Sequence, residues 1–350
     1  MTTNLQNISV DFHDSDTLLS ELKSIVSKPL VKFISASELL NRKLEILPKL
    51  IDPIFPKVGL VCLAGSSDTG KSALLRLRCL HVVTGEERFL GFPVTPQHRK
   101  AIYVSTEDDS QAVSYLLNIQ NKSKNYKSEQ IEGLKYIFEG ENTLQNLESL
   151  LAESPVDLVV IDCLTDLFGG KGSLNESTQV RAFLNPYKEL ADRHQCLIIF
   201  LHHTGKRTSD FEPSKANLLG SQGIESKMRL VVELRVDPVD PTLRHLCVVK
   251  GNYLTREYKN ESFVLRFDDD MTFHNTGSRR PFEELTQKCS RERTPNEQKA
   301  KELASTGLSQ RKIAKQLDLS VSTVNKYVRS FDTLSETNER TPEHEDKPPF

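Results

Sequence analysis

The sequence predicts an α/β protein whose core is a doubly wound, mostly parallel sheet with an appended β-meander, followed by a small all-α module. Three observations predict this fold class. A glycine-bounded loop stands between an apolar strand and a helix at Gly65–Ser72. Near-continuous apolar runs then alternate with helical segments up to His203, as expected of parallel strands covered on both faces. Beyond Met228, strand-like runs follow one another with little helix between them.

Length, charge and cysteine usage narrow the class further. The 350 residues allow one large α/β domain with small additions at either end. A net charge of −2 gives no overall attraction to nucleic acid, so any DNA contact must come from a local patch or from several assembled copies. The six cysteines stand singly, and we expect reduced thiols in a cytoplasmic protein. The sequence has no basic leader and no run of roughly 18 apolar residues, so we expect no membrane partner.

An N-terminal arm, residues 1–44, precedes the first strand. It contains one predicted amphipathic helix at Asp16–Lys28. Ser35, with Glu38 three residues later, predicts the N-cap of a second helix. The arm is either an oligomer contact or a docked or frayed segment, and the sequence leaves both open.

The first strand, Val58–Ala64, leads into a complete G-x-x-x-x-G-K-S loop, and Ala73–Leu80 follows as a helix. A phosphate chain needs a concave row of backbone N–H donors, glycines that admit the backbone, and a helix start whose positive end faces the anion. In this pattern Lys71 reaches the β- and γ-phosphates, and the Ser72 hydroxyl holds Mg²⁺. The loop therefore predicts ATP and Mg²⁺ as ligands, bound by Gly65, Ser66, Ser67, Asp68, Thr69, Gly70, Lys71 and Ser72.

The following strands alternate with helices, and each ends in polar residues. The strand ends are Thr106-Glu107-Asp108-Asp109 after Lys100–Ser105, Asp162 after Asp157–Ile161, and His202-His203 after Cys196–Leu201. Between them we expect helices at Ser110–Gln120, Thr143–Glu153 and Glu176–His194 and a short strand at Leu134–Phe138. Because the carboxyl ends of parallel strands meet at one edge of a sheet, these polar residues are expected around the ligand.

Hydrolysis requires a second contact to Mg²⁺ and a group that activates water. Asp162, at the end of an apolar strand, is the predicted second magnesium contact. Glu107 is the candidate for polarising the attacking water, because its strand is expected to lie next to the strand of the phosphate loop. Asp108 and Asp109 remain alternatives to Glu107.

The histidine pair and the late strands complete the predicted domain. His202 and His203 end a strand where a side chain can sense the γ-phosphate, and a simple hydrogen-bonded pair is the alternative. Beyond them, Met228–Val236, Leu243–Val249 and Ser262–Phe267 form the predicted meander.

These motifs together resemble the RecA/DnaB-like ATPases, specifically the RepA-like branch of plasmid replicative helicases, over roughly residues 45–270. The resemblance implies a RecA-like fold, single-stranded DNA as a partner, and a homo-oligomeric ring or filament. It also implies that Glu107 is the catalytic base and that His203 senses the γ-phosphate. Basic fingers from a neighbouring subunit would complete the site, and by position these are Arg229 and Lys250, with Arg235 as a competitor.

The C-terminal module has apolar residues at helix-turn-helix spacing: Ile313, Ala314, Leu317, Leu319, Val324 and Tyr327. The predicted helices are Pro295–Ser305, Gln310–Leu317 and Val321–Arg329, with Asp318 in place of the usual turn glycine. The module resembles the DNA-binding domains of resolvases, and its excess of basic residues suits duplex DNA. Expected DNA contacts are Arg311, Ser322, Thr323, Asn325, Lys326 and Arg329. A three-helix module that binds no DNA is the alternative.

The sequence thus predicts five parts: the arm at 1–44, a RecA-like P-loop ATPase at 45–274, a polar linker at 275–293, a helix-turn-helix at 294–330 and a disordered acidic tail at 331–350. The expected function is that of an ATP-hydrolysing motor on DNA, a replicative helicase of a plasmid or other mobile element. An ATP-switched DNA-binding regulator that separates no strands and a recombination or repair ATPase are the alternatives.

Overall fold

The computed structural model describes residues 34–43, 46–138, 140–170, 172–205, 208–220, 222–286, 296–297, 299–300 and 302–332. The predicted helix at Asp16–Lys28, the segment 287–295 and the tail from residue 333 onward lie outside these ranges. Contacts divide the chain into residues 1–47 and 48–350. In the first unit, α2 (Ala36–Asn41) begins at the N-cap Ser35, whose hydroxyl accepts a hydrogen bond from the Glu38 N–H at 3.0 Å, as predicted.

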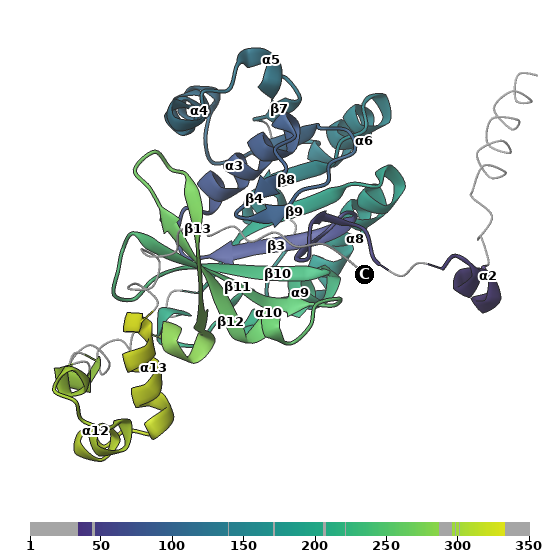
Figure 1. Ribbon diagram of the computed structural model, residues 1–350. Coiled ribbons are helices and arrows are strands. Elements are labelled where there is room, and N and C mark those ends of the chain that lie inside the picture. The colour runs from purple at the N-terminus through teal and green to yellow at the C-terminus, as the bar shows by residue number, and fades with distance from the viewer. Residues whose placement is uncertain are drawn as a thin grey trace, which may run out of the picture. The chain divides into compact units, whose positions relative to one another are not determined.

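The second unit is built on a nine-stranded sheet (Figure 1). Six neighbouring strands are parallel, and the last three continue the sheet as an antiparallel meander. This confirms the predicted fold class. In spatial order the strands are β7 (Leu134–Ile137), β6 (Ala101–Ser105), β8 (Leu158–Asp162), β9 (Leu197–His203), β3 (Gly59–Gly65), β10 (Leu230–Val236), β11 (Leu243–Gly251), β12 (Glu261–Phe267) and β13 (Phe273–Pro281).

Helices cover both faces of the sheet, which explains the continuous apolar runs of its central strands. On β3, Val61 and Leu63 belong to one buried cluster, whereas Leu60, Cys62 and Ala64 belong to the other. The first cluster includes residues of α3 (Lys71–Thr84) and of the two small antiparallel pairs, β1 (Lys49–Ile51) with β2 (Phe55–Pro56) and β4 (Arg88–Phe89) with β5 (Phe92–Pro93). The second includes residues of α6 (Thr143–Glu153), α7 (Leu164–Phe168), α8 (Ser177–His194) and α9 (Gln222–Lys227).

The remaining elements connect these layers. They are α4 (Ser110–Lys124), which extends beyond the predicted Gln120, α5 (Ser128–Ile131), α10 (Glu257–Asn260), and the short 3-10 helices η2 (Thr208–Asp210), η3 (Lys215–Asn217) and η4 (Phe282–Leu285). Among the described residues, no helix is long and apolar enough to span a membrane.

One expectation about the sheet is wrong. β6, which precedes Glu107, is not a neighbour of β3, because β9 and β8 lie between them. Strand order depends on how each crossover packs over the sheet, and that contact is made between segments far apart in sequence. Glu107 therefore has to reach the phosphate loop across the ends of two other strands.

The predicted linker at Asn275–Arg293 is also wrong in its first part. Residues up to Pro281 form β13, which pairs with β12, and η4 then buries Phe282 and Leu285 beside Cys247. β13 is an edge strand whose side chains are mostly exposed or half-buried, so its sequence is polar and shows no apolar periodicity. The boundary predicted at residue 274 therefore falls inside the sheet.

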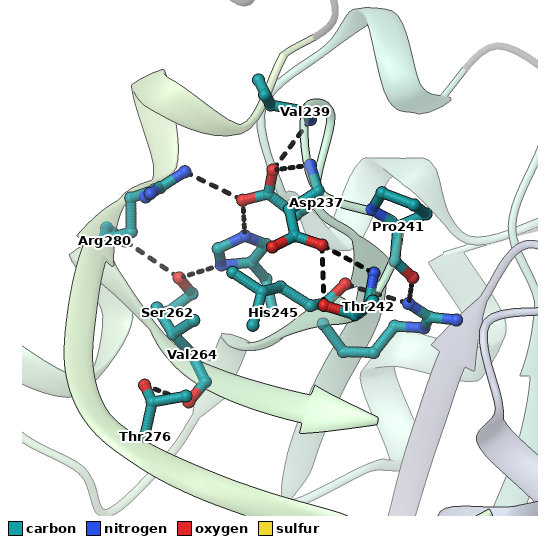
Figure 2. Close-up of polar contacts among 12 residues, drawn as sticks. Asp237, Val239, Pro241, Thr242, His245, Ser262, Val264, Thr276 and Arg280 are labelled. Carbon is teal, nitrogen blue, oxygen red and sulfur yellow. Dashed lines mark hydrogen bonds and ion pairs between the residues drawn. The ribbon is translucent and has the colours of Figure 1, made fainter. Parts of the chain in front are cut away.

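A buried polar network connects the strands of the meander through hydrogen bonds (Figure 2). The Asp237 carboxylate accepts hydrogen bonds from His245 Nε2 and Arg280 Nη1, both at 2.8 Å, and His245 Nδ1 contacts the Ser262 hydroxyl at 2.9 Å. Burial opposes ionisation of Asp237, but the hydrogen bonds from His245 and the backbone hold the pKa of its carboxyl well below the usual range. Burial also lowers the pKa of His245, and the hydrogen bond to Asp237 opposes that fall. Because Ser262 and His245 are fully buried, the network is structural.

The C-terminal helices form their own apolar cluster. α12 (Gln310–Leu317) and α13 (Val321–Asp332) bury Ile313, Ala314, Val324 and Tyr327, with Leu317 and Leu319 packed against them. These are the residues that the sequence assigned to the helix contacts. Asp318 has φ 54° and ends α12 in the left-handed conformation, as its place in the turn requires.

Candidate nucleotide site

The glycine-bounded loop between β3 and α3 is held in a tight turn. Lys71 Nζ donates a hydrogen bond to the Ser66 carbonyl at 2.6 Å, and the Thr69 hydroxyl donates to the same carbonyl at 3.0 Å. Gly70 has φ 88° and stands at the start of α3, which leaves the first N–H groups of that helix for an anion. A Cβ on Gly65 would lie 2.6 Å from the Leu234 carbonyl oxygen, so only glycine fits there.

The loop opens into a cavity of about 270 Å³ that Glu107 and His203 also line. Glu107 Oε1 lies 3.5 Å from His203 Nε2. Burial lowers the pKa of Lys71, while the charges of Asp162 and Glu107 act in the opposite sense. Residues from the ends of β3, β6 and β9 therefore meet at one cavity, as expected from the parallel sheet.

The structure separates Glu107 from its two neighbours. Asp109 is the N-cap of α4, and its carboxylate accepts hydrogen bonds from the N–H groups of Gln111 at 3.0 Å and Ala112 at 2.8 Å. Asp108 does not line the cavity. Of the three acids that the sequence left open, Glu107 is the one that faces the loop.

Asp162, at the end of β8, is buried beside the loop. One carboxylate oxygen, Oδ2, accepts a hydrogen bond from the Tyr103 hydroxyl at 2.6 Å, and the other, Oδ1, is buried without a partner among the described residues. Burial raises the pKa of Asp162, and hydrogen bonds from Tyr103 and Ser72 oppose that rise. An unsatisfied carboxylate oxygen near a serine hydroxyl is a set of hard oxygen donors, which fits Mg²⁺.

The histidine pair divides into two different environments. His202 is fully buried, and its Nε2 donates a hydrogen bond to the Leu219 carbonyl at 2.6 Å. Burial lowers the pKa of His202 to about 4. His203 is half-buried and lines the cavity, and its carbonyl accepts from the Leu219 N–H at 3.1 Å. The pair therefore combines a hydrogen-bonded core histidine with a histidine at the site.

The structure does not bring Arg229 or Lys250 to this cavity. Arg229 directly precedes β10, and Lys250, on β11, pairs with Val231 near the start of β10, whereas the loop follows the carboxyl end of the neighbouring β3. Arg229 Nη1 donates to the Val58 carbonyl at 3.2 Å, and Lys250 lies 3.8 Å from the Glu225 carboxylate. The competitor Arg235 is buried, with its Nε 2.7 Å from the Glu233 carboxylate.

Sequence reasoning missed two residues that contact the site. Arg244, on β11, donates a hydrogen bond from Nε to the Thr69 carbonyl at 3.0 Å, and its guanidinium lies over the Phe267 ring. Cys163, one of the six cysteines expected only to be reduced thiols, donates from Sγ to Glu107 Oε1 at 3.3 Å. Burial raises the pKa of this thiol to about 12. Its position directly after Asp162 was the available signal, whereas nothing local to Arg244 points to the loop.

At the start of α13, the residues expected to contact DNA are partly engaged in capping. The Ser320 hydroxyl accepts a hydrogen bond from the Thr323 N–H at 3.1 Å and contacts the hydroxyls of Ser322 and Thr323. Arg311 and Ser322 are exposed, and Asn325 is half-buried. The side chains of Lys326 and Arg329 lie outside the described part of the structure.

Comparison with known proteins agrees with this geometry. No curated protein matches the chain in sequence. Among solved structures, the chain is similar to the ATPase domain of the protein G40-P, with a TM-score of 0.50 and 13% identity, over 76% of this chain and 99% of that one. This likeness shows a RecA-like fold. The family described as "AAA domain" matches residues 27–209, slightly more than half of the sequence. The chain belongs to this family of AAA-domain ATPases.

Proposed function

We propose that this protein is an ATP-hydrolysing motor that acts on DNA as an oligomeric replicative helicase of a plasmid or other mobile element. The observation that carries the proposal is the position of Glu107, whose carboxylate shares one cavity with Lys71 and the start of α3. The similar solved structure is described as an ATPase domain, which supports the hydrolytic part.

The residues around the cavity divide the chemistry among them. The N–H groups at the start of α3 and the Lys71 ammonium bind the phosphates. Glu107 accepts a proton from the water that attacks the γ-phosphate. Ser72 and Asp162 hold Mg²⁺, which when bound neutralises phosphate charge. His203 is assigned the response to the γ-phosphate, and the 3.5 Å between its Nε2 and Glu107 Oε1 supports this assignment.

An oligomer is part of the proposal because the cavity has too little positive charge for the transition state. Lys71 is the one basic side chain among the described residues that line it, apart from the titratable His203. Phosphoryl transfer commonly uses a second cationic group to balance the developing charge. We therefore assign that group to a second copy of this chain, with Arg229 and Lys250 as the candidates, because Arg235 is buried against Glu233 of its own chain.

DNA binding is assigned to two places. The motor domain takes single-stranded DNA, and α12 with α13 form a helix-turn-helix that binds duplex DNA. The support for the second assignment is the compact apolar cluster of Ile313, Ala314, Val324 and Tyr327 together with the left-handed turn at Asp318.

The test uses the full-length protein with ATP and a forked DNA duplex. We expect hydrolysis that DNA stimulates and strand separation that requires ATP, both lost in Lys71→Ala. Hydrolysis without strand separation under any salt or magnesium condition would instead support an ATP-switched DNA-binding regulator. Continuous filaments on single-stranded DNA with strand pairing would support a recombination ATPase.

A further inference from the structure

Three side chains of different chemistry converge beside the phosphate loop. Glu107 follows β6, Cys163 follows β8, and His203 ends β9. Their ligand atoms all lie within 4.8 Å of one another. Cys163 Sγ is 3.3 Å from Glu107 Oε1, and His203 Nε2 is 3.5 Å from the same oxygen.

These separations suit a small tetrahedral cation. With zinc bonds of about 2.3 Å to sulfur and about 2.0 to 2.1 Å to nitrogen or oxygen, ligand atoms in a tetrahedron lie about 3.3 to 3.6 Å apart. Two of the three pairs already have such separations. Small side-chain rotations would therefore complete the geometry without moving the strands.

The ligand types separate this site from the magnesium pair. Ser72 and Asp162 offer hard oxygen atoms, which suit Mg²⁺. A thiolate, an imidazole and one carboxylate select a borderline-soft ion such as Zn²⁺. The two sets are adjacent, because Cys163 directly follows Asp162, but they share no ligand.

The cluster is accessible from one side. The side chains of Glu107 and His203 are 50% and 31% exposed, and both line the cavity of about 270 Å³. Cys163 is buried and does not line the cavity. An ion entering from the cavity would meet the carboxylate and imidazole first and the sulfur last. Lys71 lines the same cavity, and its positive charge limits the affinity.

We propose that Glu107, Cys163 and His203 bind Zn²⁺ and that the bound ion inhibits ATP hydrolysis. The Cys163 thiol releases its proton to solvent as the sulfur–zinc bond forms, and the fourth position remains for water or a phosphate oxygen. Inhibition follows because the Glu107 carboxylate then donates its electron pair to the metal and no longer accepts a proton from water. This inhibitory consequence rests on the proposed function of Glu107, whereas metal binding does not.

The binding test uses full-length metal-free protein and Co²⁺ as the spectroscopic probe. We expect one equivalent of Co²⁺ to produce a thiolate-to-cobalt charge-transfer band, which Zn²⁺ then removes. The band should disappear in Cys163→Ser, with at least about tenfold weaker zinc affinity, because a ligand has been removed. The matched control is Cys196→Ser, a buried cysteine that precedes β9 at the end opposite His203. An unchanged titration in Cys163→Ser, or no band in the parent protein, would overturn the proposal.

The activity test measures ATP turnover with Mg²⁺ while Zn²⁺ is added. We expect zinc to inhibit the parent and Cys196→Ser, whereas the turnover of Cys163→Ser, measured against that variant's own rate without zinc, resists inhibition. A bound ion that leaves turnover unchanged would refute the inhibitory role. If the parent hydrolyses no ATP, the proposed function fails, but the cobalt titration still decides the metal site. If Cys163→Ser does not fold, the same cobalt titration is carried out on His203→Gln, in which we expect a weaker charge-transfer band. Full retention of the band in that variant would count against the site.

Discussion

Arg244 Nε donates a hydrogen bond to the Thr69 carbonyl oxygen at 3.0 Å, so a strand of the meander holds the backbone of the phosphate loop. The same guanidinium donates from Nη1 to the Pro241 carbonyl at 2.6 Å and covers the Phe267 ring. The meander is therefore part of the nucleotide site as well as an extension of the sheet.

Replacing Arg244 should loosen the loop. Arg244→Met keeps much of the apolar stem but removes the charged donors, each worth about 1.5 to 3 kcal/mol to stability. We expect a lower melting temperature and at least about tenfold weaker ATP binding, measured by calorimetry. Arg244→Lys keeps the charge but not the planar guanidinium. Its melting temperature and ATP affinity should lie between those of the parent and those of Arg244→Met. Unchanged ATP affinity in Arg244→Met would mean that the loop keeps its shape without this contact.

Substitutions at Glu107 and Lys71 should impair ATP turnover and ATP binding to different extents. Glu107→Gln removes the proton acceptor and leaves the phosphate contacts, so we expect ATP to be retained while turnover falls by about 10² to 10⁴. Lys71→Ala removes a phosphate contact, so nucleotide binding should fall as well. The matched control is Asp109→Asn, because asparagine is an equally good N-cap and the site should be unaffected. Rapid hydrolysis by Glu107→Gln would assign the base to another residue.

The buried network around Asp237 predicts a specific loss of stability in acid. The folded-state pKa of Asp237 lies below its ordinary value, so its contribution is complete above about pH 3.9 and is lost below that pH. The folded-state pKa of His245 is also lowered, so its contribution is complete above about pH 6.5 and declines as the pH falls. Urea unfolding across this range should therefore show two successive losses.

Asp237→Asn tests the assignment. It removes the buried negative charge from His245 and Arg280, and we expect about 3 kcal/mol lower stability at neutral pH. The difference in unfolding free energy between the parent and Asp237→Asn should become smaller at acid pH. There the parent loses the stabilisation that ionised Asp237 provides, which the variant lacks at every pH. A difference that does not change with pH would show that packing, and not charge, explains the effect.

The domain boundary can be tested by two truncations. Residues 1–286 keep β13, the Arg280–Asp237 ion pair and the buried Phe282 and Leu285, so we expect a cooperatively folded ATPase. Residues 1–274 lose these contacts and leave β12 as an unpaired edge, which favours aggregation. Melting curves and gel filtration of both fragments provide the measurement. Equal stability of the two fragments would place the boundary at the position first predicted from the sequence.

Two substitutions in α13 should separate the contribution of sequence recognition to DNA binding from that of electrostatic attraction. In full-length protein, Asn325→Ala should cost roughly 1–3 kcal/mol at the preferred duplex site and little elsewhere. Lys326→Ala should weaken binding to every duplex and reduce the salt dependence by about one phosphate contact. Selection from a randomised duplex pool, followed by a salt series, gives both quantities. Equal losses for the two variants, with no sequence enriched, would indicate a non-specific clamp or a protein-binding module.

The predictable parts of this structure are those set by neighbouring residues. The phosphate loop, the strand that ends at Asp162, the N-cap at Ser35 and the cluster around Ile313 all follow from local spacing. Local spacing also limited the candidates for the catalytic base to three adjacent acidic residues. Choosing Glu107 required the structure, because Asp109 was already used as a helix cap.

The unpredicted parts depend on distant contacts. The place of β6 in the sheet, the contact of Arg244 with the loop and the pairing of β13 each join segments far apart in the chain. A polar edge strand such as β13 has the composition of a linker, since one side of it meets water. Arg244 is a single arginine in a strand, and its partner is a backbone carbonyl that no side-chain pattern reveals.

The contact between Arg244 and Thr69 joins residues 175 positions apart, and this fixes when the site can form during synthesis. The phosphate loop leaves the ribosome first, followed by Glu107, Asp162 and His203, and only later by the strand that carries Arg244. Until then the growing chain has a nucleotide-binding loop without its clamp. ATP can therefore stabilise the domain to its full extent only after most of the sheet has been made, and the earlier strands must stay unaggregated with less help from the ligand.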